Sequence, residues 1–99
     1  MDFQSILPAA FAGSWFSRES DKHSSRLWRI VPVDGKDGDL ATLLVGLEGV
    51  QHGRMFAVPG LERQTEDGQW VPVGALMSHQ AKASDWVIVQ QQKELNNDG

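Results

Sequence analysis

The sequence feature that most constrains the fold is residues 65–89, where a tight-turn signal is followed by strand-forming residues. The dipeptide Asp67–Gly68 tolerates the positive φ angles found at the tip of a β-hairpin. The segment 70–73 supplies the aromatic and β-branched residues that favour a strand. A short connector of small and polar residues, 77–84, is compatible with one or two helical turns and leads to a final strand at 86–90. We therefore predict a hairpin, a short helical connector and a closing strand.

The preceding part of the chain alternates short apolar segments with turn signals, which is typical of a small antiparallel sheet. Side-chain alternation places Trp15 and Phe16 on opposite faces, whereas Trp28 and Ile30 share one face. We predict strands at residues 14–18, 26–33, 40–47, 55–58, 70–73 and 86–90, with loops or turns at 19–25, 33–39, 49–54 and 59–60.

The most apolar segment of the chain is residues 40–47. Leu43, Leu44 and Val45 form its centre, and glycines lie on both sides of it. A short continuous apolar run bounded by turn residues is consistent with a strand that is buried on both faces. We therefore expect a buried strand here.

Residues 2–13 form a helix candidate because their apolar side chains recur at helical spacing. Pro8 constrains where this helix begins, since proline is tolerated in the first turn and disruptive further along. With Ser5 as the N-cap, Pro8 falls in the first turn, so we expect either a helix from near Ser5 or a turn followed by a short helix. Gly13 is the expected stop. The apolar stripe consists of Phe3, Ile6, Leu7, Ala10 and Phe11.

These elements predict an α+β fold, a small twisted antiparallel β-sheet with an N-terminal helix and a short helical connector before the last strand. Residues 1–90 are expected to form a single domain, and residues 91–99 a flexible polar tail. A domain of 99 residues buries only about 60–65 % of its unfolded surface. Because exposed sheet edges invite pairing with other strands, we expect a homo-oligomer.

Composition excludes several classes of protein and of site. The chain has no cysteine, so disulfides and thiolate metal sites are excluded. No apolar run approaches the ~20 residues of a membrane span, and no signal-peptide pattern is present, so we expect no membrane partner and a cytoplasmic protein. The net charge of −4, with both signs scattered, argues against direct nucleic-acid binding.

No catalytic or metal-binding pattern is present. The Gly-x-Ser-x-Gly, Walker and dinucleotide-binding motifs do not occur. His23, His52 and His79 fall in three different loops without metal-ligand spacing, so a zinc site built from all three is disfavoured against solvated loop side chains. We expect neither an enzyme nor a bound cofactor or metal.

Two terminal segments carry a resemblance to a known family. Residues 65–72 read Thr-x-Asp-Gly-x-x-Val-Pro, and residues 83–89 read Ala-x-Asp-Trp-x-Ile-Val. The chain also begins Met-x-Phe, continues with a helix candidate and Arg18, and has a strand that ends in Val31–Pro32. In these segments, though not in the middle of the chain, it resembles the second type of Thoeris anti-defence protein, a family of small phage domains.

The resemblance implies a function, a ligand and an assembly. Members of that family are not enzymes; they bind and hide the cyclic ADP-ribose isomer that a bacterial TIR-domain enzyme makes on infection, and they form tetramers with pockets between subunits. In place of the family's Trp-Asn-Gly-Lys-Gly loop this chain has residues 21–25, Asp-Lys-His-Ser-Ser. We therefore expect a phage anti-defence protein that sequesters a cyclic nucleotide signal, either a cyclic ADP-ribose isomer or a cyclic oligonucleotide, in the cytoplasm of an infected bacterium.

Binding such a ligand requires aromatic faces for the bases and cationic or amide groups for the phosphates. Two segments supply such groups, and they form a pocket if they meet in the fold or across a subunit boundary. The candidate ligand-binding residues are Lys22, His23, Arg26, Trp28, Trp70, Ser78 and His79.

Three alternatives remain open from the sequence. The loop at 19–25 can be a solvated connector, and Trp28 and Trp70 can be core residues instead of pocket residues. In addition, the scaffold can serve as a protein-binding inhibitor of a bacterial defence effector, such as a CRISPR effector, for which the apolar middle segment 40–58 is the supporting feature.

Overall fold

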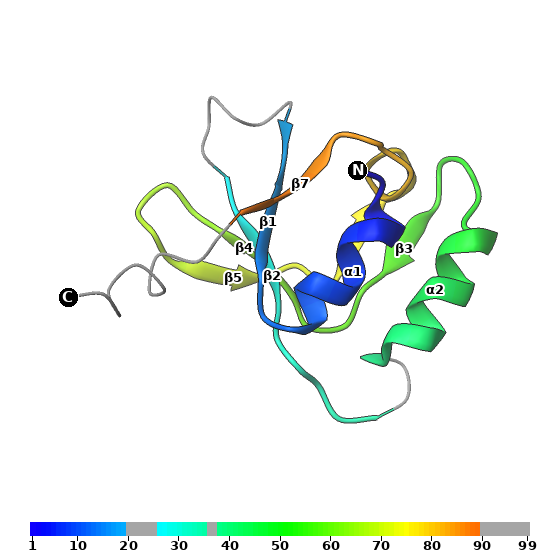
Figure 1. Ribbon diagram of the computed structural model, residues 1–99, viewed down its shortest axis with the longest axis horizontal. Coiled ribbons are helices and arrows are strands. Elements are labelled where there is room, and N and C mark those ends of the chain that lie inside the picture. Colours follow the sequence, from blue (N-terminus) through cyan, green and yellow to red (C-terminus); the bar gives the residue numbers. More distant parts are fainter. Residues whose placement is uncertain (20–25, 36–37, 90–99) are drawn as a thin grey trace.

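The computed structural model describes residues 1–19, 26–35 and 38–89, which form an α+β fold (Figure 1). The elements follow one another as α1 (Phe3–Phe11), β1 (Trp15–Arg18), β2 (Trp28–Ile30), α2 (Leu40–Gly49), β3 (Met55–Ala57), β4 (Leu61–Gln64), β5 (Trp70–Pro72), β6 (Ala75–Met77), α3 (Ser78–Ala81) and β7 (Trp86–Val89). The predicted fold class is therefore confirmed. The predicted tail at 91–99 lies outside the described residues.

The strands form a five-stranded sheet in the order β5-β4-β2-β1-β7 and a two-stranded sheet of β3 and β6. Every strand pair among the described residues runs antiparallel. The register sets Phe16 opposite Trp28, and Trp28 opposite Arg63. On the last strand, Trp86 lies opposite Arg18. The predicted hairpin is the β4–β5 pair, with Gly68 at φ 89° in its turn, and the predicted connector contains α3.

Helix α1 begins earlier than the sequence predicts. The carboxylate of Asp2, not the hydroxyl of Ser5, caps it, since Asp2 Oδ1 accepts a 2.9 Å hydrogen bond from the Ser5 N–H. Pro8 therefore lies in the interior of the helix, where it removes one backbone hydrogen bond. Burial of Phe3, Ile6, Leu7 and Ala10 against the sheet outweighs that cost. Gly13, at φ 108°, ends the helix as predicted.

The buried strand predicted at 40–47 is wrong, because these residues belong to helix α2. Asp39 caps this helix through a 2.9 Å hydrogen bond from the Thr42 N–H to its Oδ1. Leu43 is buried, and Leu44 and Leu47, at helical spacing, are partly buried against the core. The cap and this spacing decide between helix and strand, which the continuous apolar run alone does not.

The core lies between the five-stranded sheet and α1 and continues to α2 and the two-stranded sheet; the Trp86 ring contacts several of its residues. The Trp86 ring is fully buried and lies 5.1 Å from the Phe3 ring, 5.7 Å from Phe16 and 5.9 Å from Trp28, measured between centroids. Its Nε1–H donates a 2.9 Å hydrogen bond to the Gln80 carbonyl in α3. This one indole therefore contacts α1, strands β1 and β2 and the connector helix α3.

One glycine is required by the packing. Gly60 begins the turn into β4 with φ 85°, and its carbonyl accepts a 2.8 Å hydrogen bond from the Val31 N–H. A Cβ atom there would collide with the Val31 carbonyl oxygen. Only glycine combines this left-handed backbone with so close an approach to β2.

Candidate ligand-binding face

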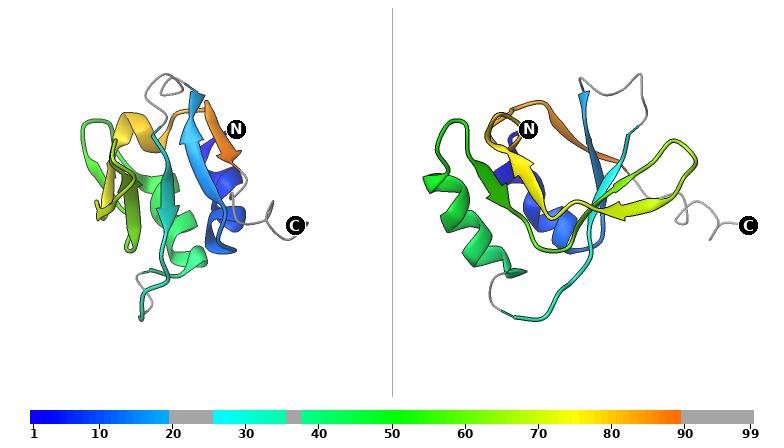
Figure 2. Two further views of the ribbon diagram at one scale, coloured as in Figure 1. Left: turned by 90° about the vertical axis from the view of Figure 1, so that its left-hand side faces the viewer. Right: turned by 180° about the vertical axis from the view of Figure 1, so that it is seen from behind.

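The outer face of the five-stranded sheet is the surface turned away from α1. Because side chains alternate along strands, the neighbours of the core residues point to this side. They are Trp15 and Ser17 on β1, Arg29 on β2, Glu62 and Gln64 on β4, Trp70 and Pro72 on β5, and Val87 and Val89 on β7. In the left view of Figure 2, strands β1 and β2 lie in front of α1 and α2. None of the three described helices packs on the outer face.

The two tryptophans of the outer face contact each other although two strands separate them. The Trp15 and Trp70 ring centroids lie 5.4 Å apart with an interplanar angle of 57°. Both residues are half-buried. A planar group cannot enter between rings this close and this tilted, so a ligand ring would stack against their exposed surfaces.

Arg29 adds a cation to this pair. Its guanidinium carbon lies 4.3 Å from the centre of the Trp70 ring, in cation–π geometry. The Arg29 Nε–H donates a 2.8 Å hydrogen bond to Glu62 Oε1, and the Nη2 of Arg29 is 2.7 Å from the same oxygen. The Arg29 side chain remains 34 % exposed, so the guanidinium is held in place yet reachable from solvent.

The outer face offers binding groups and not a reactive pair. Indole surfaces stack on flat rings, and a guanidinium pairs with phosphate or carboxylate oxygens. The carboxylate of Glu62 faces Arg29, and the Ser17 hydroxyl donates a 3.3 Å hydrogen bond to the Arg18 carbonyl. The residues described on this face thus fit recognition of a flat, anionic molecule.

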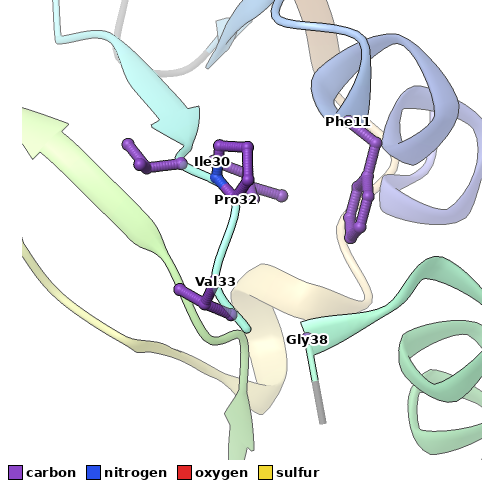
Figure 3. Close-up of a pocket in the computed structure, with 6 residues that line it drawn as sticks. Phe11, Ile30, Pro32, Val33 and Gly38 are labelled. Carbon is purple, nitrogen blue, oxygen red and sulfur yellow. The ribbon is translucent and has the colours of Figure 1, made fainter. Parts of the chain in front are cut away.

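A cavity at the end of α1 has different chemistry (Figure 3). It measures about 170 Å³ and lies between the end of α1, the end of β2 and the segment before α2. None of the described residues that line it has an ionisable side chain. Its lining residues are Phe11, Ile30, Val31, Pro32, Val33 and Gly38.

The structure places Trp28 and Trp70 on opposite faces of the sheet. Trp28 is 2 % exposed and belongs to the core, where the Arg63 guanidinium carbon lies 5.5 Å from its ring. Its Nε1 atom is buried without a hydrogen-bond partner among the described residues. Of the two predicted stacking residues, only Trp70 is therefore accessible to a ligand.

Two of the remaining predicted residues, Ser78 and His79, lie in α3 and not on the outer face. Lys22 and His23 lie outside the described residues, and Arg26 is half-buried just before β2. Ser78 is buried in α3, where its Oγ accepts a 2.8 Å hydrogen bond from the Gly53 N–H and so fixes the loop before β3. His79 is exposed on the same short helix. The structure does not bring α3 to the outer face.

Sequence reasoning did not select Trp15 or Arg29, although part of the signal was present. The predicted alternation already directs Trp15 to the face away from Phe16, and Arg29 to the face away from Trp28. What was missing is the strand order, which sets β5 and β1 on either side of β4 and β2. Strand order depends on contacts between distant segments, so local patterns do not reveal it.

Within residues 1–19, 26–35 and 38–89 no three His, Asp or Glu side chains are grouped so that they could hold a metal ion. None of the described helices has the length and apolar character required to span a lipid bilayer. Comparison of the chain with protein-family models, curated proteins and solved structures found no match.

Proposed function

We propose that this protein is a non-catalytic phage anti-defence protein that binds and sequesters a cyclic nucleotide immune signal on the outer face. The supporting observation is the stack of Trp15, Trp70 and Arg29, an aromatic pair with a fixed cation on an open sheet. The anti-defence role follows the resemblance of the terminal segments to the Thoeris anti-defence family. The ligand is a cyclic ADP-ribose isomer or a cyclic oligonucleotide.

The chemistry of the outer face matches both parts of such a ligand. Stacking of a base on an indole contributes roughly 1–3 kcal/mol. The Arg29 guanidinium supplies a charge-assisted hydrogen bond to a phosphate, in competition with Glu62. Sequestration requires binding alone, so the proposal includes no catalytic residue and no cofactor.

Other residues enter this proposal on sequence grounds. Lys22, His23 and Arg26 supply further cationic and polar groups next to β2 in the chain, and the resemblance adds a homo-oligomer with pockets between subunits. Cytoplasmic action in an infected bacterium is part of the same proposal.

Isothermal titration with a panel of cyclic ADP-ribose isomers and cyclic oligonucleotides tests the proposal. We expect one member to bind, and Trp70→Ala and Arg29→Ala to weaken that binding at least about tenfold each. Val71→Ala is the matched control, because Val71 is the next residue of β5 and points to the other face. Absence of binding by a folded sample across the panel would reject the proposal.

A protein-binding inhibitor of a defence effector is the second candidate, and the same observation supports it. Tryptophan and arginine are enriched among the residues that dominate protein–protein binding energy. If this candidate is correct, we expect a defence effector to co-purify with the protein and to be lost from the Trp70→Ala variant. We also expect the protein to bind no nucleotide of the panel.

A further inference from the structure

The ion pair between Arg29 and Glu62 uses only part of the guanidinium. The Arg29 Nε–H donates a 2.8 Å hydrogen bond to Glu62 Oε1, and Arg29 Nη2 lies 2.7 Å from that same oxygen. Both contacts lie on the side of the group that carries Nε. A guanidinium has further N–H donors in the same plane, on the far edge formed by Nη1 and the second N–H of Nη2. Within residues 1–19, 26–35 and 38–89, no group accepts a hydrogen bond from Arg29 Nη1.

The sheet and the Trp70 ring together fix the position of this far edge. Arg29 and Glu62 lie directly opposite each other on β2 and β4, so the strand register determines their pairing. The guanidinium carbon lies 4.3 Å from the centre of the Trp70 ring. The Glu62 side chain is 22 % exposed and that of Arg29 is 34 % exposed, so the carboxylate is the more buried partner. An anion therefore reaches Arg29 from solvent without displacing Glu62.

The charge of Glu62 determines which anion gains most from this contact. The pair has no net charge, so it attracts an anion only because the guanidinium is the nearer of the two groups. The attraction grows in proportion to the charge of the anion, whereas the cost of removing that anion from water grows with the square of its charge. A weakly positive site therefore favours a singly charged anion over a doubly charged one.

We propose that Glu62 makes the outer face selective for phosphates that carry one negative charge, and directs it against terminal phosphomonoesters. A phosphodiester or an internal pyrophosphate unit carries one charge per phosphate, whereas a monoester carries roughly −1.5 to −2 at pH 7. Cyclic nucleotides contain the first kind alone. Linear nucleotides that end in a phosphate contain the second kind and compete poorly. The inference rests on the proposed function, because it concerns the same site and names the kind of phosphate that this site accepts.

In this arrangement Glu62 is a positioning residue that acts through Arg29. It holds the Nε side of the guanidinium, which leaves the far edge for the ligand, and it reduces the positive potential that the ligand meets. Glu62→Gln removes the charge but keeps an amide oxygen that accepts from Arg29. The lost repulsion is proportional to the charge of the ligand, so this variant should gain most affinity for the more highly charged nucleotide.

Calorimetry with two matched pairs of nucleotides tests the inference. Cyclic di-AMP is compared with the linear dinucleotide pApA, in which one phosphodiester is opened to a terminal monoester. Cyclic ADP-ribose is compared with its 2′-phosphate. We expect the wild-type protein to bind the member without a monoester at least about tenfold more tightly in the pair that binds, and Glu62→Gln to reduce this ratio at least about fivefold.

Two further variants separate the charge of Glu62 from its size and from the net charge of the protein. Glu62→Asp restores a carboxylate and should restore the preference. Glu48→Gln is the matched control, because it removes one carboxylate from the exposed side of α2, away from the outer face, and should leave the ratio unchanged. A preference that persists in Glu62→Gln would show selection by shape and would overturn the inference, as would a Glu62→Asp variant that behaves like Glu62→Gln.

Failure of the inference and failure of the proposed function have different signatures. A wild-type protein that binds both members of a pair equally well would overturn the selectivity and leave sequestration on the outer face intact. Absence of binding by all four nucleotides would overturn the inference for these ligands, and the wider panel of cyclic nucleotides would then decide on the proposed function.

Discussion

The chain has four tryptophans, and the five-stranded sheet divides them into two pairs with different surroundings. Trp28 and Trp86 face α1, are at most 2 % exposed and contact each other edge to face. Trp15 and Trp70 lie on the outer face, remain half-buried and contact Arg29 or each other. The inner pair is surrounded by phenylalanines and a helix, whereas the outer pair has a guanidinium above one ring and no described helix over it.

This difference shows that residue type does not determine the role of a tryptophan here. The inner pair removes apolar area from water and thereby stabilises the fold. The outer pair leaves part of its area in water, which contributes less to folding and remains available to a ligand or partner. The comparison therefore predicts that substitutions of the inner pair affect stability, and substitutions of the outer pair affect binding.

Substitution of Trp86 should have the largest effect. Trp86→Ala removes a ring that packs on Phe3 and Phe16 and donates to Gln80, so we expect the free energy of unfolding to fall by about 3–5 kcal/mol. Trp70→Ala should lower it by only about 0.5–1.5 kcal/mol, the range for an aromatic contact with a cation–π partner. Urea denaturation measures both.

Trp86→Phe is the second variant to measure in case Trp86→Ala does not fold. It keeps an aromatic ring in the core and removes mainly the hydrogen bond to the Gln80 carbonyl. If Trp86→Phe and Trp70→Ala lower the free energy of unfolding equally, the inner and outer pairs do not differ in their contribution to stability. A loss at Trp70 larger than the loss at Trp86→Ala would contradict the division into a folding pair and a binding pair.

Two of the arginines that lie over tryptophan rings, one for each pair, test the same difference. Arg29 stacks on Trp70 of the outer pair, and Arg63 lies over Trp28 of the inner pair. We expect Arg29→Ala to weaken nucleotide binding at least about tenfold and to lower the free energy of unfolding by about 0.5–1 kcal/mol. Arg63→Ala should leave the affinity unchanged, as measured by calorimetry. A loss of affinity with Arg63→Ala alone would place the ligand elsewhere.

Acid titration should have the smallest effect, and it compares the start of α1 with the turn of the β4–β5 hairpin. Hydrogen bonds from Ser5 hold the pKa of Asp2, which caps α1, below its usual 3.8, and the bond from the Thr65 hydroxyl does the same for the pKa of Asp67 in the β4–β5 hairpin. Since the folded pKa is the lower one, each carboxylate stabilises the fold above pH 3.8 and loses that contribution as the pH falls through its folded pKa.

Both carboxylates are exposed, so the loss should be small for each. Asp2→Asn and Asp67→Asn should each flatten part of the dependence of the melting temperature on pH in this acidic range. Variants that keep the full wild-type dependence would show that neither hydrogen bond favours the ionised carboxylate.

Much of the fold could be predicted from the sequence because its signals are local. The Asp67–Gly68 turn, the stop at Gly13 and the helical connector each depend on neighbouring residues, and the structure contains all three. Helix α2 could not be predicted, because a short apolar run has the same appearance in a buried strand and in a helix. The hydrogen bond to Asp39 that caps the helix distinguishes the two structures, but in the sequence an aspartate at this position is equally typical of a turn.

The candidate site was less predictable than the fold because it is built across strands. Trp70 was selected from the sequence, whereas its partners Trp15 and Arg29 come from β1 and β2 and meet it only through the strand order. Trp28 was selected for the same reason as Trp70, yet strand alternation directs it into the core. The order of the strands in the sheet therefore determines which tryptophans are accessible to a ligand.

The indole N–H signals of the protein give the most direct test of the central claim, that the outer pair binds the ligand and the inner pair supports the fold. Each of the four tryptophans contributes one such NMR signal, assignable by Trp→Phe substitution. On titration with the cyclic nucleotide that binds in calorimetry, we predict shifts of the Trp15 and Trp70 signals while those of Trp28 and Trp86 stay in place. Shifts confined to Trp28 and Trp86, or no indole shift at saturation, would contradict the account.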